Sequence, residues 1–243
     1  VEDPATNNID SDTNNIDSNT NNIDSNTNDK DTKIVYTSFY PMYDFALKIG
    51  GDRIQVTNMV PAGSEPHYWE PTAANIVDLE NADMFIYNGA GMEHWVEDIL
   101  GSLQNKDLIA IEASKEIDLL KGHGHDGEDE HDGEDEETVF DPHVWLNPMY
   151  AKKEMENIKN GLVEIDPTNK EYYENNYSKY ANELDTLDKE FRDTLSILPN
   201  KDIIVSHEAF GYLCQAYGLK QIAIQGLSAE AEPSSSRMSE IID

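Results

Sequence analysis

From Lys33 onward, short apolar runs alternate with helix-like segments, and this alternation constrains the fold more than any other feature of the chain. The runs typical of buried strands cover residues 34–39, 53–60, 84–87, 108–112, 202–206 and 219–225. Helices are expected between them, at residues 41–51, 72–82, 93–100, 148–165, 166–198 and 208–217. Strand–helix alternation predicts an α/β fold with mostly parallel sheets covered by helices.

The longest expected helix, residues 166–198, carries apolar side chains three or four positions apart from Tyr173 to Phe191. At ~1.5 Å per residue this helix would be about 45 Å long and rigid, enough to join two lobes. The expected organisation is an N-terminal α/β lobe at 33–147, linking helices at 148–199 and the start of a C-terminal α/β lobe at 200–243. Because only two strand–helix units follow the long helix, the second lobe is expected to be truncated.

Two segments contain too few apolar residues to build a core. Residues 1–32 repeat Asn-Asn-Ile-Asp from Asn7, Asn14 and Asn21, and one apolar position per repeat excludes a coiled-coil seam. We interpret this segment as a disordered spacer. Residues 122–137 contain acidic side chains, glycines and three histidines without any lysine or arginine, and they are expected to form a mobile loop.

The formal charge is −32, from 17 basic and 49 acidic side chains. This charge argues against nucleic acid and anionic membrane surfaces as partners, because both need a basic face. The only cysteine, Cys214, is expected to be a packed thiol that forms no disulfide. No apolar run reaches the roughly 20 residues of a membrane span, and a targeting segment is expected to have been removed before Val1.

Three histidines far apart in the sequence, His67, His143 and His207, lie among apolar and aromatic residues near prolines or strand ends. His67 and His207 follow expected strands, and open parallel sheets bind ligands beyond the carboxyl ends of their strands. Pro142 and Pro148 predict a short extended segment around His143. We therefore expect the three imidazoles to meet around one metal ion in a cleft between the lobes.

Imidazole suits zinc, copper, nickel and iron better than magnesium or calcium, and three histidines leave one coordination position open. His94 is interpreted as an exposed helix residue outside this site. The aromatic side chains of Tyr68, Trp69 and Trp145 are expected to form the walls of the cleft. Glu230 and Glu232 are expected at most to support the ligands.

Four segments, GSEPHYWEP at 63–71, DPHVWLNP at 141–148, VSHEAFGY at 205–212 and GLSAEAEPS at 226–234, resemble the zinc/manganese-binding solute receptors of ABC importers. This resemblance covers residues 33–243. It implies two lobes joined by a long rigid helix, with His67, His143 and His207 as metal ligands. The family's fourth ligand is usually an acidic residue beyond the last motif. The chain ends at Asp243 before such a position, so water or a lost ligand is ranked above Glu65 for the fourth place.

The resemblance also implies function. The chain would be an extracytoplasmic lipoprotein receptor, a monomer anchored through its removed N-terminal segment, that hands Zn²⁺ to an ABC permease without making or breaking a bond. A loop rich in histidine and acid is typical of the zinc branch, so Zn²⁺ is ranked above Mn²⁺. His123, His125 and His131 are expected to act as accessory metal ligands, the alternative being a solvated charge run. Binding is expected to weaken below about pH 6 as imidazoles are protonated.

Two other classes of function stay open from the residues alone. Three histidines with an open position also occur in zinc hydrolases, although no His-Glu-x-x-His motif is present. A surface adhesin with an incidental metal is compatible with the N-terminal spacer. We expect a binding protein rather than an enzyme.

Overall fold

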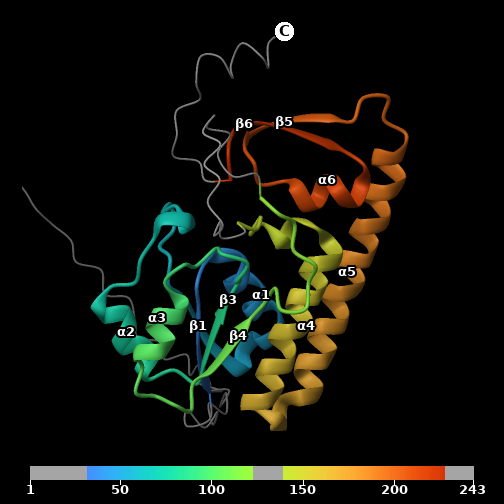
Figure 1. The fold of residues 1–243 in the computed structure, drawn as a ribbon. Coiled ribbons are helices and arrows are strands. Elements are labelled where there is room, and N and C mark those ends of the chain that lie inside the picture. Colours follow the sequence, from blue (N-terminus) through green and yellow to red (C-terminus); the bar gives the residue numbers. More distant parts are fainter. Residues whose placement is uncertain (1–31, 123–138, 228–243) are drawn as a thin grey trace, which may run out of the picture. The chain divides into compact units, whose positions relative to one another are not determined.

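The computed structural model describes residues 32–122 and 139–227. In these ranges, four parallel strands form one sheet with the order β2-β1-β3-β4, and two parallel strands form another (Figure 1). The strands of the first sheet are β1 Lys33–Thr37, β2 Ile54–Asn58, β3 Met84–Tyr87 and β4 Ile109–Glu112. The second sheet pairs β5 Asp202–His207 with β6 Lys220–Gln225. The predicted α/β class with parallel sheets is confirmed.

Helices connect the strands. They are α1 Tyr40–Gly50, α2 Ala73–Glu80, α3 Val96–Ser102, α4 Pro148–Ile165, α5 Lys170–Ser196 and α6 Gly211–Tyr217. Four short 3-10 helices are η1 Gly51–Arg53, η2 Pro66–Tyr68, η3 Val144–Leu146 and η4 Pro167–Asn169. The bounds predicted for α4 agree with the structure, and two sequence signals mark the start of this helix. Pro148 occupies the first turn, and the Asn147 side chain accepts a hydrogen bond from the Met149 backbone N–H at 2.9 Å.

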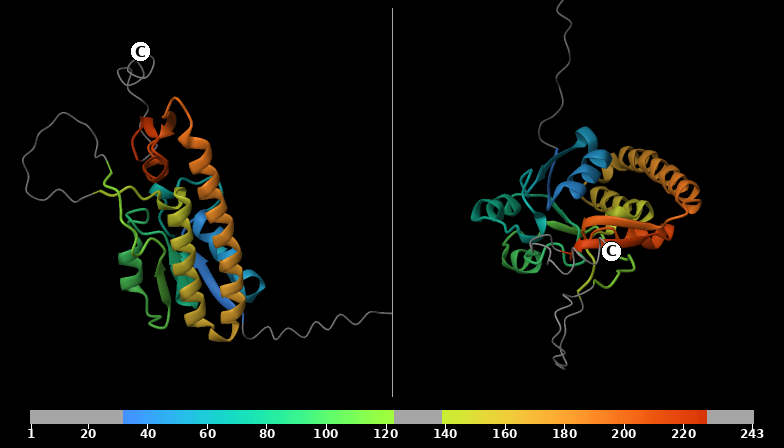
Figure 2. Two further views of the ribbon diagram at one scale, coloured as in Figure 1. Left: turned by 90° about the vertical axis from the view of Figure 1, so that its right-hand side faces the viewer. Right: turned by 90° about the horizontal axis from the view of Figure 1, so that it is seen from above.

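Helices cover both faces of the first sheet (Figures 1 and 2). Helices α1, α4 and α5 pack on one face, where Val35, Met84 and Ile86 belong to the larger apolar cluster. Helices α2 and α3 pack on the other face around Phe85. Phe85 lies between Met84 and Ile86 in β3, so the strand buries both of its faces, as expected for a strand inside a parallel sheet.

Helix α5 runs alongside α4 and reaches the second sheet's helix α6 (Figure 2). Its 27 residues correspond to about 40 Å. At one end, Tyr173 is fully buried in the larger cluster. Towards the other end, Phe191 meets Tyr217 of α6 edge-on with ring centroids 5.2 Å apart, and Tyr217 Oη donates to Asp188 Oδ1 at 3.0 Å. The predicted apolar stripe therefore packs against elements of both sheets.

Two local expectations were wrong. His143 has φ −81° and ψ 44° and forms the N-cap of η3, so it does not lie in an extended segment. Helix α3 begins at Val96 instead of residue 93, because the Glu93 carboxylate is bound by backbone N–H groups of the preceding turn. The single thiol, Cys214, is buried in α6 as expected.

Some expectations lie outside the described residues. They are the spacer through residue 31 and the loop from residue 123 to 137. The domain boundaries at 147 and 199 remain predictions. In the described ranges, no helix combines the length and apolar character needed to cross a membrane.

Candidate metal centre

The structure brings the three predicted histidines together. His67 lies in η2, His143 immediately precedes η3, and His207 ends β5. Nε2 of His143 lies 3.2 Å from Nε2 of His67 and 3.2 Å from Nε2 of His207. The potential ligand atoms of all three lie within 4.8 Å of one another. In the described ranges they form the one group of histidine, cysteine or carboxylate side chains with such spacing.

These distances suit a tetrahedral metal ion. Zinc–imidazole bonds of about 2.0–2.1 Å at tetrahedral angles place two ligand nitrogens about 3.3 Å apart. The two measured separations of 3.2 Å are close to that value. The remaining separation, between His67 and His207, is at most 4.8 Å, so these two rings would have to approach each other for three nitrogens to surround one ion. The arrangement can therefore hold a borderline cation such as zinc with one position left for another ligand.

A buried carboxylate orients the central ring. Asp141 Oδ1 lies 2.7 Å from His143 Nδ1 and accepts a hydrogen bond from the His143 backbone N–H at 2.9 Å. Both side chains are almost fully buried. The carboxylate requires the proton to lie on Nδ1, which leaves the Nε2 lone pair facing the other two histidines. Such carboxylate–histidine pairs fix the ring and raise its basicity as a metal ligand.

The backbone of Asp141 is held by α6 and by the segment before residue 122. Tyr212 Oη donates to the Asp141 backbone carbonyl at 2.7 Å, and the Leu120 backbone N–H donates to Tyr212 Oη at 3.0 Å. A Cβ atom on Gly211 would lie 2.5 Å from Asp141 Oδ2. Because atoms do not approach that closely, only glycine fits position 211 without displacing the carboxylate.

The first sheet supports the same segment through Asn88, directly after β3. Asn88 Nδ2 donates to the Pro142 carbonyl at 2.9 Å, one residue before His143. The backbone N–H groups of Asn88 and Gly89 donate to the Glu93 carboxylate at 2.9 and 3.0 Å. Sequence reasoning missed Asn88, although an asparagine at the carboxyl end of a parallel strand is a position where such a contact is expected.

Burial keeps the imidazoles of His67 and His207 neutral. Burial, followed by the proximity of His143, lowers the pKa of His67 to about 4. The same two causes, in the same order, lower the pKa of His207. The carboxylate of Glu65 opposes part of this decrease at both rings. At neutral pH, His67 and His207 therefore present lone pairs suited to a metal.

The other predicted site residues are placed as follows. Glu65 Oε1 accepts a long hydrogen bond of 3.3 Å from the His67 backbone N–H, but its carboxylate is not part of the three-histidine group. The exposed His94 precedes α3 instead of lying in a helix, and it pairs with Glu70 at 3.6 Å. His123, His125, His131, Glu230 and Glu232 lie outside the described residues.

Two of the three predicted wall residues contact other aromatic rings around the site. The Trp145 ring centroid lies 5.4 Å from that of His143 and 5.1 Å from that of Phe39. The ring centroids of Trp69 and Trp95 lie 5.5 Å apart. Trp69 therefore anchors the segment after His67 to the apolar cluster around Phe85. Tyr68 is 43% exposed.

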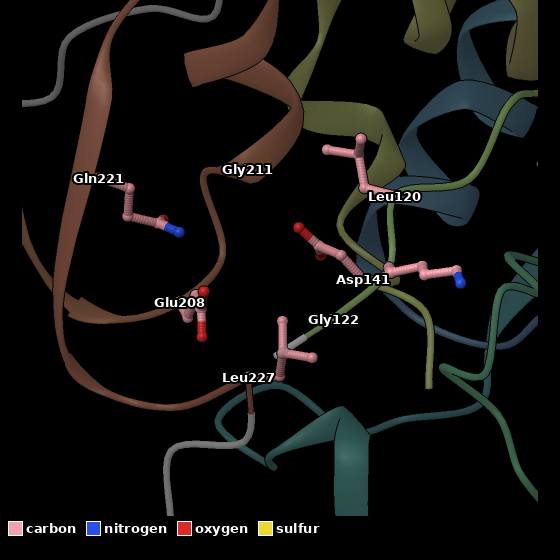
Figure 3. Close-up of a pocket in the computed structure, with 8 residues that line it drawn as sticks. Leu120, Gly122, Asp141, Glu208, Gly211, Gln221 and Leu227 are labelled. Carbon is pink, nitrogen blue, oxygen red and sulfur yellow. The ribbon is translucent and has the colours of Figure 1, made fainter. Parts of the chain in front are cut away.

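A pocket of about 300 Å³ lies beside Asp141 (Figure 3). Residues 120–122 line one side, and Glu208, Gly211, Gln221 and Leu227 line the rest. None of the three histidines is among the described residues that line it. The pocket therefore opens onto the carboxylate that orients His143, and the three-histidine group lies outside its lining.

Comparisons with known proteins agree with this geometry. A family model described as ZnuA, zinc-uptake complex component A periplasmic, matches residues 35–243. The high-affinity zinc uptake system protein ZnuA of Bacillus subtilis is 45% identical over 208 residues, which are 85% of this chain and 65% of that protein. The Zn(II)-bound structure of AdcA from Streptococcus pneumoniae is 38% identical with a TM-score of 0.73, covering 86% of this chain and 43% of that one. This chain therefore spans less than two thirds of either relative.

A third similar protein is named for a different function. A mutant structure of the laminin-binding adhesin Lmb from Streptococcus agalactiae is 32% identical with a TM-score of 0.75, covering 86% of this chain and 75% of that chain. The same fold is therefore found in proteins named for zinc uptake and in one named for adhesion.

Proposed function

Because the chain belongs to the ZnuA family of zinc-uptake components, a family of solute-binding proteins, we propose that it captures Zn²⁺ for an ABC importer. The observation that carries this proposal is the convergence of three imidazole Nε2 atoms, each of the two outer ones 3.2 Å from the central one. Zinc is the cargo, and no bond of a substrate is broken. The names of the relatives, which refer to zinc, support the same cargo.

In this proposal, His67, His143 and His207 supply three ligands, and Asp141 holds the His143 ring in place. Water takes the fourth position ahead of Glu65, whose carboxylate acts electrostatically on His67 and His207 without joining their group. Zinc is favoured over manganese because imidazole-rich sites bind it more tightly and manganese prefers oxygen ligands. His123, His125 and His131 act as weaker accessory ligands that raise the local concentration of zinc.

The proposed partner is a membrane permease that receives the metal outside the cytoplasm. The proposed receptor acts as a monomer, with residues 1–32 as the spacer between a membrane anchor and the folded part. The lobes at 33–147 and 200–243, joined by the helices at 148–199, would place the three ligands where two α/β units meet. The proposal includes neither hydrolysis nor adhesion. To bind zinc, the three imidazoles need only replace water molecules in the coordination shell of the ion.

Zinc titration against a competing chromogenic chelator tests the proposal. We expect one tightly bound zinc per chain. Each of the three variants His67→Ala, His143→Ala and His207→Ala should lower the zinc affinity. The loss should exceed the roughly 10- to 100-fold that follows from removing a side chain that only supports a ligand. The matched control is His94→Ala, because His94 is an exposed histidine outside the group. Equal losses in the control, or tight zinc binding by all three site variants, would reject the assignment.

A further inference from the structure

Glu154, on the buried face of α4, has an unusual environment. Its side chain is completely buried, and neither carboxylate oxygen has a hydrogen-bond partner among the described residues. A buried, ionised carboxylate without partners is strongly disfavoured, and even a neutral acid loses its hydrogen bonds with water. Native interiors satisfy such groups with protein atoms or with ordered water.

Two more buried polar atoms, Ser114 Oγ and Asn88 Oδ1, have no hydrogen-bond partner in the part of the chain that the structure describes, and they lie on neighbouring segments. The Ser114 backbone N–H donates to the Asn88 carbonyl at 3.0 Å, which joins the ends of β4 and β3. Asn157, one helical turn after Glu154, donates to the carbonyls of Ala113 and Lys115 at 2.8 and 2.9 Å. The face of α4 that carries Glu154 is thus held against the segment that carries Ser114.

Glu93 provides the contrast. Its carboxylate accepts hydrogen bonds from Ser38 Oγ at 2.6 Å and from the Asn88 and Gly89 backbone N–H groups at 2.9 and 3.0 Å. These donors favour the anionic form of Glu93, although burial raises its pKa to about 7. Glu154 has no such donor among the described residues. Burial, followed by the charge of Glu93, raises the pKa of Glu154 well above its ordinary value, so Glu154 retains its proton in the folded chain.

We propose that Glu154, Ser114 and Asn88 line an internal hydration site in which ordered water binds the neutral carboxyl group of Glu154. The chemistry of the atoms suits water, because water accepts from the carboxyl O–H and donates to Asn88 Oδ1 and Ser114 Oγ. A bound cation would instead need the ionised acid. The site is next to the segment that carries His143, because Asn88 Nδ2 donates to the carbonyl of the preceding residue, Pro142. It does not depend on the zinc function.

The first test compares Glu154→Gln with wild type and with Glu156→Gln, a partly exposed glutamate of the same helix that pairs with Lys153. The titratable side chains that act electrostatically with Glu154 are Glu93, after β3, and Tyr212 of α6. Urea unfolding is measured at pH 5 and at pH 6. As the pH rises by this one unit, the folding equilibrium constant of the wild type should fall about tenfold relative to that of Glu154→Gln, because only the unfolded state releases the Glu154 proton. The Glu156→Gln variant should show no such change relative to wild type. A ratio for Glu154→Gln that stays constant with pH would overturn the proposal.

The second test needs no variant. A high-resolution crystal structure of the wild-type chain should show water within hydrogen-bond distance of Glu154 and of Ser114 Oγ or Asn88 Oδ1. In infrared spectra at pH 7, the carbonyl stretch of protonated carboxyl groups should be weaker in Glu154→Gln than in wild type, because only the contribution of Glu93 is left, and it should be unchanged in Glu156→Gln. A dry cavity, a cation at the site or an ionised Glu154 at pH 7 would each reject the inference.

Discussion

Asp141 Oδ1 lies 2.7 Å from His143 Nδ1, and both side chains are buried. Because the acid is buried, this contact holds the central histidine in a single tautomer and orientation. A similar pair at the surface, Glu70 and His94 at 3.6 Å, is largely exposed to water and lacks that constraint. The exposed pair can therefore serve as a control for the effect of the buried carboxylate on its histidine.

Replacing Asp141 by asparagine should weaken zinc binding by about 10- to 100-fold. The amide keeps the size of the side chain but removes the charge that stabilises the Nδ1 proton and raises the basicity of Nε2. Competition with a chelator measures the affinity, and Glu70→Gln is the control that should leave it unchanged. An unchanged affinity for Asp141→Asn would mean that the buried pair has no role in binding.

Adding one methyl group at position 211 should disturb the same carboxylate. The Cβ of Gly211→Ala would lie 2.5 Å from Asp141 Oδ2, so Asp141 or the start of α6 must shift. We expect a loss of zinc affinity of about tenfold, comparable with loss of a supporting contact. At Gly101 a Cβ would meet open space, and Gly101→Ala should leave binding intact while stabilising helix α3 by up to about 1 kcal/mol. Equal affinities for both variants would contradict the steric argument.

The buried imidazoles of the metal-free protein should contribute less to its stability in mild acid. The pKa of His67 is lowered to about 4, so between about pH 6.5 and pH 4 the unfolded chain binds a proton at this residue that the folded chain does not. The contribution of His67 to stability therefore rises with pH across that window, opposite in sign to the contribution of Glu154. Comparison with His67→Ala isolates it: measured with a chelator present, the urea midpoint of the wild type should fall relative to that of His67→Ala between pH 6.5 and 4.5.

The same lowered pKa values revise the expected pH dependence of zinc binding. An onset below about pH 6 assumed the ordinary pKa of an exposed imidazole. Protons compete with zinc for His67 and His207 only at more acidic pH, because burial disfavours their charged forms. The loss of affinity due to protonation of His67 is thus expected near pH 4, and the loss due to His207 at a lower pH than for an exposed imidazole. A wild-type urea midpoint that does not change relative to that of His67→Ala between pH 6.5 and 4.5 would contradict both statements.

Asn88→Ala should reduce both stability and zinc affinity. The change leaves the buried carbonyl of Pro142 without its side-chain donor, which costs about 1–3 kcal/mol, and it frees the segment before His143. The control is Asn81→Ala, since Asn81 Nδ2 donates to the exposed carbonyl of Val77 at the end of α2. Urea unfolding and zinc titration of both variants separate the two effects. A loss of affinity no larger than in the control would remove Asn88 from the support of the site.

Local signals predicted much of the fold. Residues 84–87 form an apolar run closed by Asn88-Gly89, and β3 has those bounds. Pro148 predicted the start of α4, because proline favours the first turn of a helix. The start of α3 was missed because Glu93 makes contacts with Ser38, far away in the sequence. The convergence of His67 and His207 followed from their places after parallel strands. The support of His143 by Asn88 could not be predicted, because it depends on how the segment before α4 packs against β3.

Removing the histidine-rich segment should separate accessory zinc from the central site. The Gly122 backbone N–H donates to the Val139 carbonyl at 2.9 Å, and Lys121 and Phe140 form an antiparallel bridge. The two ends are therefore close enough for residues 123–138 to be replaced by a two-residue Asn-Gly turn without moving Asp141. Calorimetric titration should show one tight zinc in both proteins and additional weak binding only in the full chain. A control with His123, His125 and His131 changed to glutamine should match the deletion, because the proposed accessory ligands are imidazoles and not carboxylates. Weak binding that survives in the glutamine variant would assign it to the acidic side chains, and loss of the tight zinc on deletion would place a central ligand in the loop.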